Sequence, residues 1–264
     1  MASANHTSLK ASVVIQGRVL HALLLRELIT RFGRENLGVL WLVGEPMMFT
    51  VGIVALWSLA RLHQGVGLPI VAFAITGYST ILLWRNTVGR CVSAAGDNKQ
   101  LLYHRNVRVF DTFVARIILE IAGATSSFIV LSAVFLYAGW MAPPVDLLEV
   151  TTGWLLLAWF AAGLGLAIGS ASVFSELVER IWHPIAYFML PFSGAMVMVE
   201  WAPPDLRKYL LLFPMVHGTE MIREGWFGGA VKAHYDASYM VLCCLLLWLV
   251  ALRLQFRAAH KLGS

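Results

Sequence analysis

The sequence predicts an all-α integral membrane protein, and three observations indicate this fold class. Apolar residues make up 59% of the 264-residue chain and charged residues only 13%, against about 25% charged residues in an ordinary soluble domain. Six apolar stretches of 16 to 25 residues contain between them one charged residue, Glu45. A helix of about 20 apolar residues spans a hydrocarbon core of roughly 30 Å and satisfies its own backbone hydrogen bonds there. We therefore expect one membrane domain, residues 1–264, with six transmembrane helices at Leu37–Ala60, Leu68–Trp84, Ile121–Val145, Val150–Phe174, Ile181–Val199 and Ala237–Leu252.

The positions of the basic residues predict the orientation of these spans. An even number of spans places both termini on one side, and fifteen of the 20 Lys and Arg residues fall on that side. Cytoplasmic segments accumulate Lys and Arg, so we expect both termini in the cytoplasm. The net charge of +5 follows from this topology, and we expect no nucleic-acid partner.

A basic amphipathic interface helix is predicted before the first span, over residues 17–35. Its apolar side chains between Leu24 and Phe32 fall on one helical face, whereas Arg26, Arg31 and Arg34 fall on the other. This pattern is typical of a helix at a membrane surface. Two interpretations remain open: the helix only sets the topology, or it meets anionic head groups where a substrate enters.

Two connections between the spans have a pattern of their own. The cytoplasmic connection 85–111 is the longest on its side, and its mixed sequence indicates a short helix that ends near Asn106. The outer connection 200–236 contains apolar pieces too short to cross a membrane, separated by Pro214. Such pieces are typical of re-entrant helices, and we expect two of them between spans five and six. Pro191 permits a kink within span five.

The sequence lacks the motifs of several enzyme classes. It contains no G-x-x-x-x-G-K-[ST] phosphate loop and no H-E-x-x-H metal motif. We therefore do not expect this chain to be an ATPase of the phosphate-loop class. We expect no catalytic residues, no metal site and no bound cofactor. The small residues of Gly163–Ser172 indicate close helix packing. A second function class stays open, a polytopic membrane enzyme acting on lipid-linked sugars with Asp97, Glu120 or Glu220–Glu224 supplying carboxylates.

Two residues inside the spans are candidates for a substrate path. Glu45 is the one acidic residue within a span, and we expect it to pair with a basic neighbour because an isolated buried carboxylate is costly. Trp159 lies near the middle of span four, away from the interfaces where Trp usually gathers. It either packs in the core or stacks on the apolar face of a sliding sugar.

Three segments, in order along the chain, carry a resemblance to a known family. They are RELITRFGRENLGVLWLVGEP at Arg26–Pro46, NVRVFDTFVARIILE at Asn106–Glu120 and FPMVHGTEMIREGWFG at Phe213–Gly228. The set resembles the type-2 ABC exporter permeases that move capsular and O-antigen polysaccharides, and most of all the KpsM-like capsule permeases. The matches cover essentially the whole chain, although no single motif is strong.

The resemblance implies a permease that exports lipid-linked capsular polysaccharide across the inner membrane of a Gram-negative bacterium. It implies a homodimer with two copies of a separate ATPase subunit, which would use ATP and Mg, and a path continued by a periplasmic co-polymerase and an outer-membrane channel. O-antigen or teichoic acid export remains an alternative. We expect contacts with the ATPase at Asp97, Asn98, Leu101, Leu102, Tyr103 and His104. We expect the substrate entrance and conduit at Arg26, Arg31, Arg34, Glu45 and Trp159, and the re-entrant motif at His217, Glu220 and Arg223.

Overall fold

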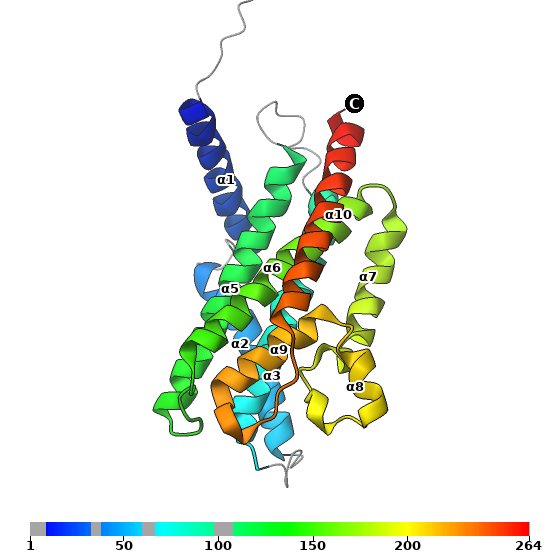
Figure 1. Ribbon diagram of the computed structural model, residues 1–264. Helices are drawn as coiled ribbons and strands as arrows, with labels where there is room; N and C mark the ends of the chain where they lie inside the picture. Colours follow the sequence, from blue (N-terminus) through cyan, green and yellow to red (C-terminus); the bar gives the residue numbers. More distant parts are fainter. Residues whose placement is uncertain (1–8, 33–37, 60–66, 98–107, 264) are drawn as a thin grey trace, which may run out of the picture.

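The computed structural model describes residues 9–32, 38–59, 67–97 and 108–263, and within these ranges it contains helices and short connections but no strands. The helices form a bundle in which α3, α5, α6 and α10 run between two ends (Figure 1). The first turn of α1 and the last turn of α10 lie at the same end. The helices are α1 (Leu9–Phe32), α2 (Gly38–Leu59), α3 (Ile70–Val92), α4 (Ala94–Asp97), α5 (Val109–Tyr137), α6 (Leu147–Ser172), α7 (Glu176–Phe188), α8 (Pro204–Leu210), α9 (Pro214–Phe227) and α10 (Ala237–Gly263).

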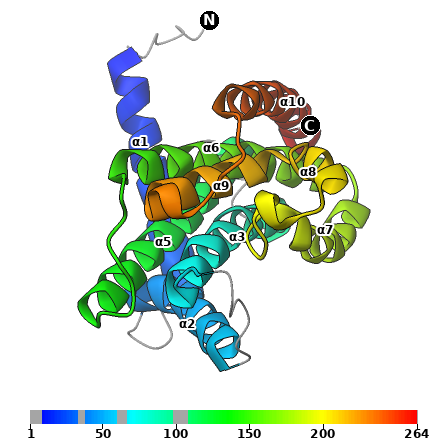
Figure 2. The same cartoon turned by 60° about the horizontal axis from the view of Figure 1, so that its bottom comes forward.

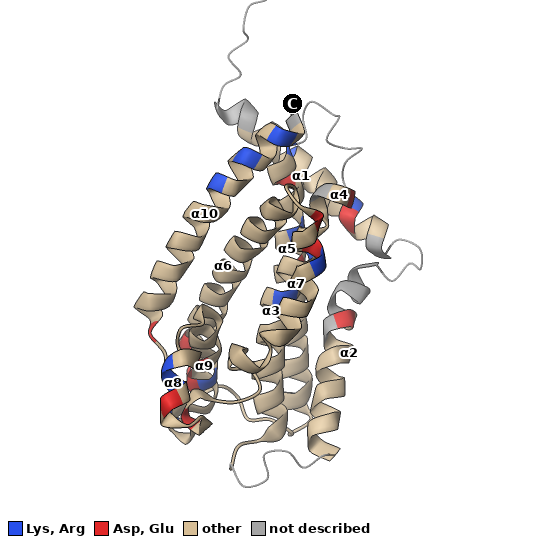
Figure 3. Ribbon diagram, turned by 90° about the vertical axis from the view of Figure 1, so that its right-hand side faces the viewer, with Lys and Arg blue, Asp and Glu red and all other residues tan. Residues whose placement is uncertain are grey.

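The all-α prediction is confirmed, and among the described residues three helices are long and apolar enough to cross a membrane: Val109–Tyr137, Leu147–Ser172 and Ala237–Leu262. A shorter apolar helix covers Met47–Leu59. Charged residues gather toward the two ends of the bundle, and the middle is largely free of them (Figure 3). This separation is what a bilayer requires, because charges are costly in its centre.

The core is built around α3, which packs against α2, α5 and α6. Small residues let α6 approach it closely, as expected from the Gly- and Ser-rich stretch. A Cβ atom added at Gly169 would lie 2.8 Å from the backbone oxygen of Cys91, and one at Gly165 would lie 3.2 Å from the Cys91 sulfur. Glycine is therefore required where these two helices cross.

The connection expected at 85–111 is shorter than predicted, and this boundary was wrong. Helix α3 continues to Val92, α4 follows at once, and α5 begins at Val109, twelve residues before the expected start of span three. Arg90 lies on α3 and Arg116 on α5, and each pairs with carboxylates of other helices. Residues 98–107 lie outside the described residues.

The fifth span is not one continuous helix over Ile181–Val199. Helix α7 begins earlier, at Glu176, and ends at Phe188, and a 3₁₀ turn follows at Pro191–Ser193. Proline cannot donate a backbone hydrogen bond and clashes with the preceding turn. Gly194 then adopts a left-handed φ of 74°, which favours glycine. The kink expected at Pro191 is thus a full interruption.

Two short helices, α8 and α9, follow the interruption and lie across the lower end of the bundle (Figure 2). Pro214 separates them by starting α9 rather than continuing α8, since proline suits the first turn of a helix. Helix α9 packs against α6. A Cβ atom at Gly225 would lie 2.7 Å from the backbone nitrogen of Val150, so α9 is fixed closely to the start of α6.

Candidate functional site

A polar cavity of about 360 Å³ opens between α2, α3 and α7. It lies near the end of the bundle where α3, α6 and α10 terminate together. Ser172 at the end of α6 donates a hydrogen bond of 2.7 Å to the backbone oxygen of Val92, and Lys261 of α10 donates one of 3.1 Å to that of Val173. The lining residues are Glu45, Arg85, Asn86, Gly89, Arg90, Ser93, Glu179, Trp182, His183, Ala186 and Tyr187.

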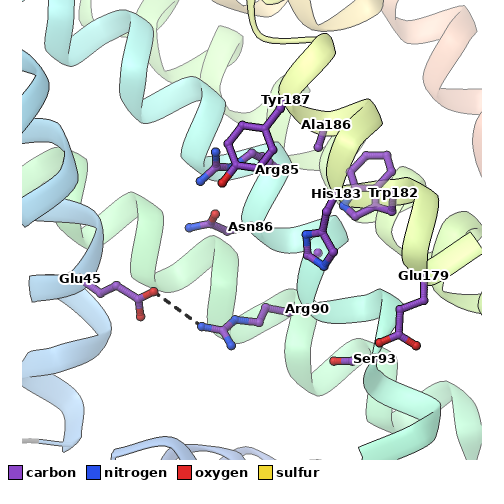
Figure 4. Close-up of a pocket in the computed structure, with 11 residues that line it drawn as sticks. Glu45, Arg85, Asn86, Arg90, Ser93, Glu179, Trp182, His183, Ala186 and Tyr187 are labelled. Carbon is purple, nitrogen blue, oxygen red and sulfur yellow. Dashed lines mark ion pairs between the residues drawn. The ribbon is translucent and has the colours of Figure 1, made fainter.

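Helix α7 forms one wall of the cavity through a narrow contact with α3. Within α7 only Trp182 and Ala186 are buried, and their spacing of four residues places them on one face. The Trp182 ring meets Trp84 of α3 edge-on, with 6.5 Å between centroids. Because these two residues hold the helix, His183 and Tyr187 are left to face the open space (Figure 4).

Two arginines of α3 supply the positive charge of the cavity. Nη2 of Arg90 lies 3.7 Å from Oε1 of Glu45, and its Nε lies 3.6 Å from Oε1 of Glu120. The Arg85 guanidinium lies over the Tyr187 ring, 5.1 Å from its centroid. Figure 4 shows Glu45 of α2 pointing across the opening toward Arg90. The pairing expected for Glu45 is present, and its partner is Arg90.

The Glu45–Arg90 pair is only partly shielded, because the two side chains are 36% and 42% exposed. Pairs of this kind contribute at most about 1 kcal/mol. A phosphate or a sugar carboxylate is therefore able to replace Glu45, since guanidinium groups bind such oxygens through two parallel hydrogen bonds. The arrangement suits reversible binding of an anionic group.

The other residues expected along a substrate path are scattered. Arg26 is half-buried on α1, the side chain of Arg31 lies outside the described residues, and so does the whole of Arg34. Trp159 is half-buried, packs against the main apolar core and accepts a hydrogen bond of 3.2 Å at its backbone oxygen from Trp248. Trp159 lies on α6 beside α10 and does not line the cavity.

Of the residues expected to contact an ATPase, the structure describes one, Asp97. It closes α4 and accepts a hydrogen bond of 3.0 Å from Arg116 of α5. Asn98, Leu101, Leu102, Tyr103 and His104 lie outside the described residues.

The three polar residues of the re-entrant motif are brought together on α9, where all three are buried. His217 accepts a hydrogen bond of 2.8 Å at Nδ1 from the backbone nitrogen of Asp236 and has Nε2 2.8 Å from the backbone oxygen of Leu211. Nδ1 is an acceptor, so the ring is neutral and carries its proton on Nε2. Glu220 accepts from the backbone nitrogens of Val199 and His234, at 3.2 and 3.0 Å. Through these bonds the two side chains fix the chain segments that precede and follow α9.

Arg223 completes this set and holds the interruption after α7. It donates to the backbone oxygens of Gly194 and Ala195, and its guanidinium carbon lies 3.8 Å from the centroid of the Phe73 ring on α3. Gly77 makes room for it, because a Cβ atom there would lie 2.2 Å from the Ala195 oxygen and 2.6 Å from Nη2 of Arg223. Burial of this cation is offset by backbone oxygens and an aromatic face.

Sequence reasoning missed the main contributors to the cavity. Arg85 and Arg90 fall in the predicted connection 85–111 and His183 in the predicted fifth span, and none of the three was expected to line a site. One signal in the sequence could have indicated the first two: no Pro separates the apolar run of α3 from Arg85 and Arg90, and the single Gly89 between the two arginines does not by itself end a helix. Within the described residues, no group of three or more His, Cys, Asp and Glu side chains is arranged to hold a metal ion.

Comparison with known proteins identifies the family. Residues 18–227 match the ABC-2 type transporter family. The chain is 48% identical over 252 residues to the capsule polysaccharide export inner-membrane protein CtrC of Neisseria meningitidis serogroup B, covering 96% of this chain and 95% of that protein. It is 41% identical over 248 residues to the capsule polysaccharide export inner-membrane protein BexB of Haemophilus influenzae, covering 94% of each, and 28% identical over 246 residues to the polysialic acid transport protein KpsM of Escherichia coli, covering 91% and 93%. The chain therefore belongs to the ABC-2 type transporter family.

Proposed function

We propose that this chain is the permease subunit of an ATP-driven exporter that moves lipid-linked capsular polysaccharide from the cytoplasm to the periplasm across a bacterial inner membrane. The observation that carries the proposal is the similarity along nearly the whole chain to relatives named as capsule polysaccharide export inner-membrane proteins. The cavity between α2, α3 and α7 supports it, because its two arginines suit an anionic lipid-linked substrate.

The proposed topology has six spans and cytoplasmic termini. The spans are α2, α3, α5, α6, α10 and the segment that begins with α7 and continues beyond its interruption. Two observations support a shared side for the termini: α1 begins and α10 ends at the same end of the bundle (Figure 1), and basic residues favour the cytoplasm. Helices α8 and α9 would then lie at the outer face, and the cavity would open toward the inner leaflet.

We assign the first contact with substrate to Arg85 and Arg90. A phosphate or acidic sugar that enters from the inner leaflet reaches both guanidinium groups from the open side of the cavity. Glu45 and Glu120 keep Arg90 paired while the cavity is empty, which lowers the cost of holding its charge within the membrane. When an anion binds, it replaces one of these two carboxylates as the partner of Arg90.

The proposed assembly is a homodimer bound to two copies of a separate ATPase, with a periplasmic co-polymerase and an outer-membrane channel continuing the path. An unpartnered apolar stripe on α7 supports the homodimer. Its members recur every three or four residues and are 42 to 67% exposed, namely Leu177, Ile181, Ile185 and Phe188. A second copy packed against this stripe would enclose the open side of the cavity. ATP and Mg would be used by the ATPase subunit.

The structure gives less support to a membrane enzyme. Three of the carboxylates considered for that role each have another partner. Asp97 binds Arg116, Glu120 pairs with Arg90, and Glu220 accepts two backbone hydrogen bonds. They lie on three different helices, α4, α5 and α9, rather than on opposite sides of one site as general acid–base catalysis requires.

Deletion of the gene followed by complementation tests the proposal. A deletion strain should retain lipid-linked polysaccharide inside the cell and lose it from the surface, and the intact gene should restore the surface polymer. The restored export should require the partner ATPase. A deletion strain that fails to make the lipid-linked polymer, with normal surface delivery of polymer supplied from another source, would instead support the enzyme.

A further inference from the structure

A single guanidinium, that of Arg116 on α5, joins four helices beside the end of α3. Its Nε lies 2.8 Å from Oε1 of Glu27 on α1. Nη1 donates to the backbone oxygen of Arg90 at 2.8 Å and to Oγ of Ser93 at 3.0 Å, and Nη2 donates to Oδ2 of Asp97 on α4 at 3.0 Å. Arg116 is only 5% exposed, and its pair with Glu27 is shielded from water, whereas Asp97 stands at the surface.

The contacts of Arg116 form a stiff connection. A buried guanidinium between two carboxylates makes charge-assisted interactions, which are stronger than neutral hydrogen bonds. The carbonyl of Arg90 belongs to the last turn of α3, where the helix dipole favours a cation. Nη1 and Nη2 donate hydrogen bonds and Nε lies in an ion pair with Glu27, an arrangement that the single ammonium of lysine cannot reproduce.

The guanidinium of Arg116 connects α4 to the cavity. Arg116 holds the backbone of Arg90, whose side chain lines the cavity and pairs with Glu45 of α2. Through Glu27 it also holds α1, which is further attached to α5 by a hydrogen bond from Gln16 to Asp111. Asp97 is 57% exposed at its side chain and is the first of the residues expected to contact the ATPase.

We propose that Arg116 is a positioning residue that transmits a displacement of α4, imposed by the ATPase, to α1 and to Arg90 in the cavity. This inference rests on the proposed function. When α4 moves, Arg116 cannot keep its bond to Asp97 without shifting Glu27 and the Arg90 carbonyl. The binding cavity and the interface helix thus change together with the ATPase contact, and the substrate is released from Arg90 in step with ATP turnover.

The test measures polysaccharide exported per ATP hydrolysed by the reconstituted permease–ATPase complex. The variants are Glu27→Gln, Asp97→Asn and their combination, with Asp97→Glu as the conservative change. Arg180→Gln is the control, because its pair with Glu176 is exposed at 77% and 87% of the two side chains. Glu27→Gln, away from the expected ATPase contact, should assemble and hydrolyse ATP, and both single variants should export roughly two- to thirty-fold less per ATP hydrolysed, the range by which residues along a coupling path act.

The combined variant should export as much polysaccharide per ATP as the single variant with the lower export, because both changes break the same connection. Asp97→Glu should restore most of the export per ATP. Normal export per ATP in the single variants, independent effects that add, or a loss fully explained by failed assembly would overturn the role of Arg116. The unmodified complex separates this inference from the function it rests on. If that complex hydrolyses ATP and exports no polysaccharide, the proposed function itself fails.

Discussion

Glu45 of α2 and Arg90 of α3 form an ion pair across the opening of the cavity, with 3.7 Å between Oε1 and Nη2. The pair connects the one acidic residue within the apolar stretches of the sequence to an arginine that the sequence alone placed in a loop. It also fixes the position of α2 against α3 at the site where we propose that the substrate binds.

Neutralising the cavity should reduce export. A hydrogen bond to a charged group contributes about 1.5–3 kcal/mol, so the combined variant Arg85→Gln, Arg90→Gln should raise the polysaccharide concentration needed for half-maximal transport roughly ten- to a hundred-fold. Transport in proteoliposomes at varied substrate concentration measures this. The variant Glu45→Gln, Arg90→Gln, which removes one charge of each sign, controls for the cost of an unpaired Glu45. Unchanged half-maximal concentrations in both would remove the cavity from the substrate path.

Gly77 should not accept a side chain. In Gly77→Ala the new Cβ would lie 2.2 Å from the Ala195 oxygen, and overpacking of this kind costs about 1–3 kcal/mol. The melting temperature in detergent should therefore fall. Gly52→Ala is the matched control, since nothing lies within 4 Å of a Cβ there, and alanine favours a helix over glycine. Equal melting temperatures for the two variants would contradict the close packing of Arg223 and Ala195 against α3.

Helix α8 should lie in the membrane at the outer face. Its apolar residues Leu206 and Tyr209 are 52% and 56% exposed in the isolated chain, and the bilayer would cover them. In a background without the native cysteines, Leu206→Cys should react slowly with a bulky impermeant thiol reagent applied from outside. Asp205→Cys, one residue earlier and exposed, should react fast. Fast reaction at both positions would mean that α8 is exposed to water.

The outer cluster around Glu200 should stabilise the protein in a pH-dependent way. His234 donates a hydrogen bond of 2.5 Å to Glu200, and this bond, together with the charges of Arg207 and Lys232, lowers the pKa of Glu200. A lowered pKa means that the stabilisation is present above the unfolded pKa of about 4.3 and is lost as the pH falls through the folded value.

The melting temperature of the wild type should accordingly exceed that of Glu200→Gln near neutral pH, and the difference should shrink as the pH falls below about 4.3 and vanish once the pH is below the folded pKa. Asp205→Asn, an exposed change nearby, is the control. A difference between wild type and Glu200→Gln that persists at low pH would show that Glu200 acts through packing and not through its charge.

The sequence predicted α6 within three residues at its start and two at its end, because a continuous apolar run begins at a good cap. Asp146 accepts hydrogen bonds of 2.9 and 3.0 Å from the backbone nitrogens of Leu148 and Glu149. The sequence did not predict how far α3 and α5 extend. Arg90 and Arg116 are charged, and they lie on these helices with partners on other helices that the sequence does not reveal.

The candidate site was predictable only in part. Glu45 stood out as a charge within an apolar stretch, and the expectation of a basic partner was correct. That partner could not be identified because Arg90 is 45 residues away in the sequence. His217, Glu220 and Arg223 stood out as a motif, yet their contacts with the backbone groups of six other residues depend on the folded arrangement alone.

ATP-dependent transfer of lipid-linked polysaccharide into inverted inner-membrane vesicles tests the central claim most directly. Vesicles that contain this chain and its partner ATPase should take up labelled polymer only with ATP, and vanadate should stop the uptake. Vesicles with this chain alone should take up none. Chemical conversion of the lipid-linked polymer by this chain without any ATPase, with no ATP-dependent uptake in the complete vesicles, would contradict the account.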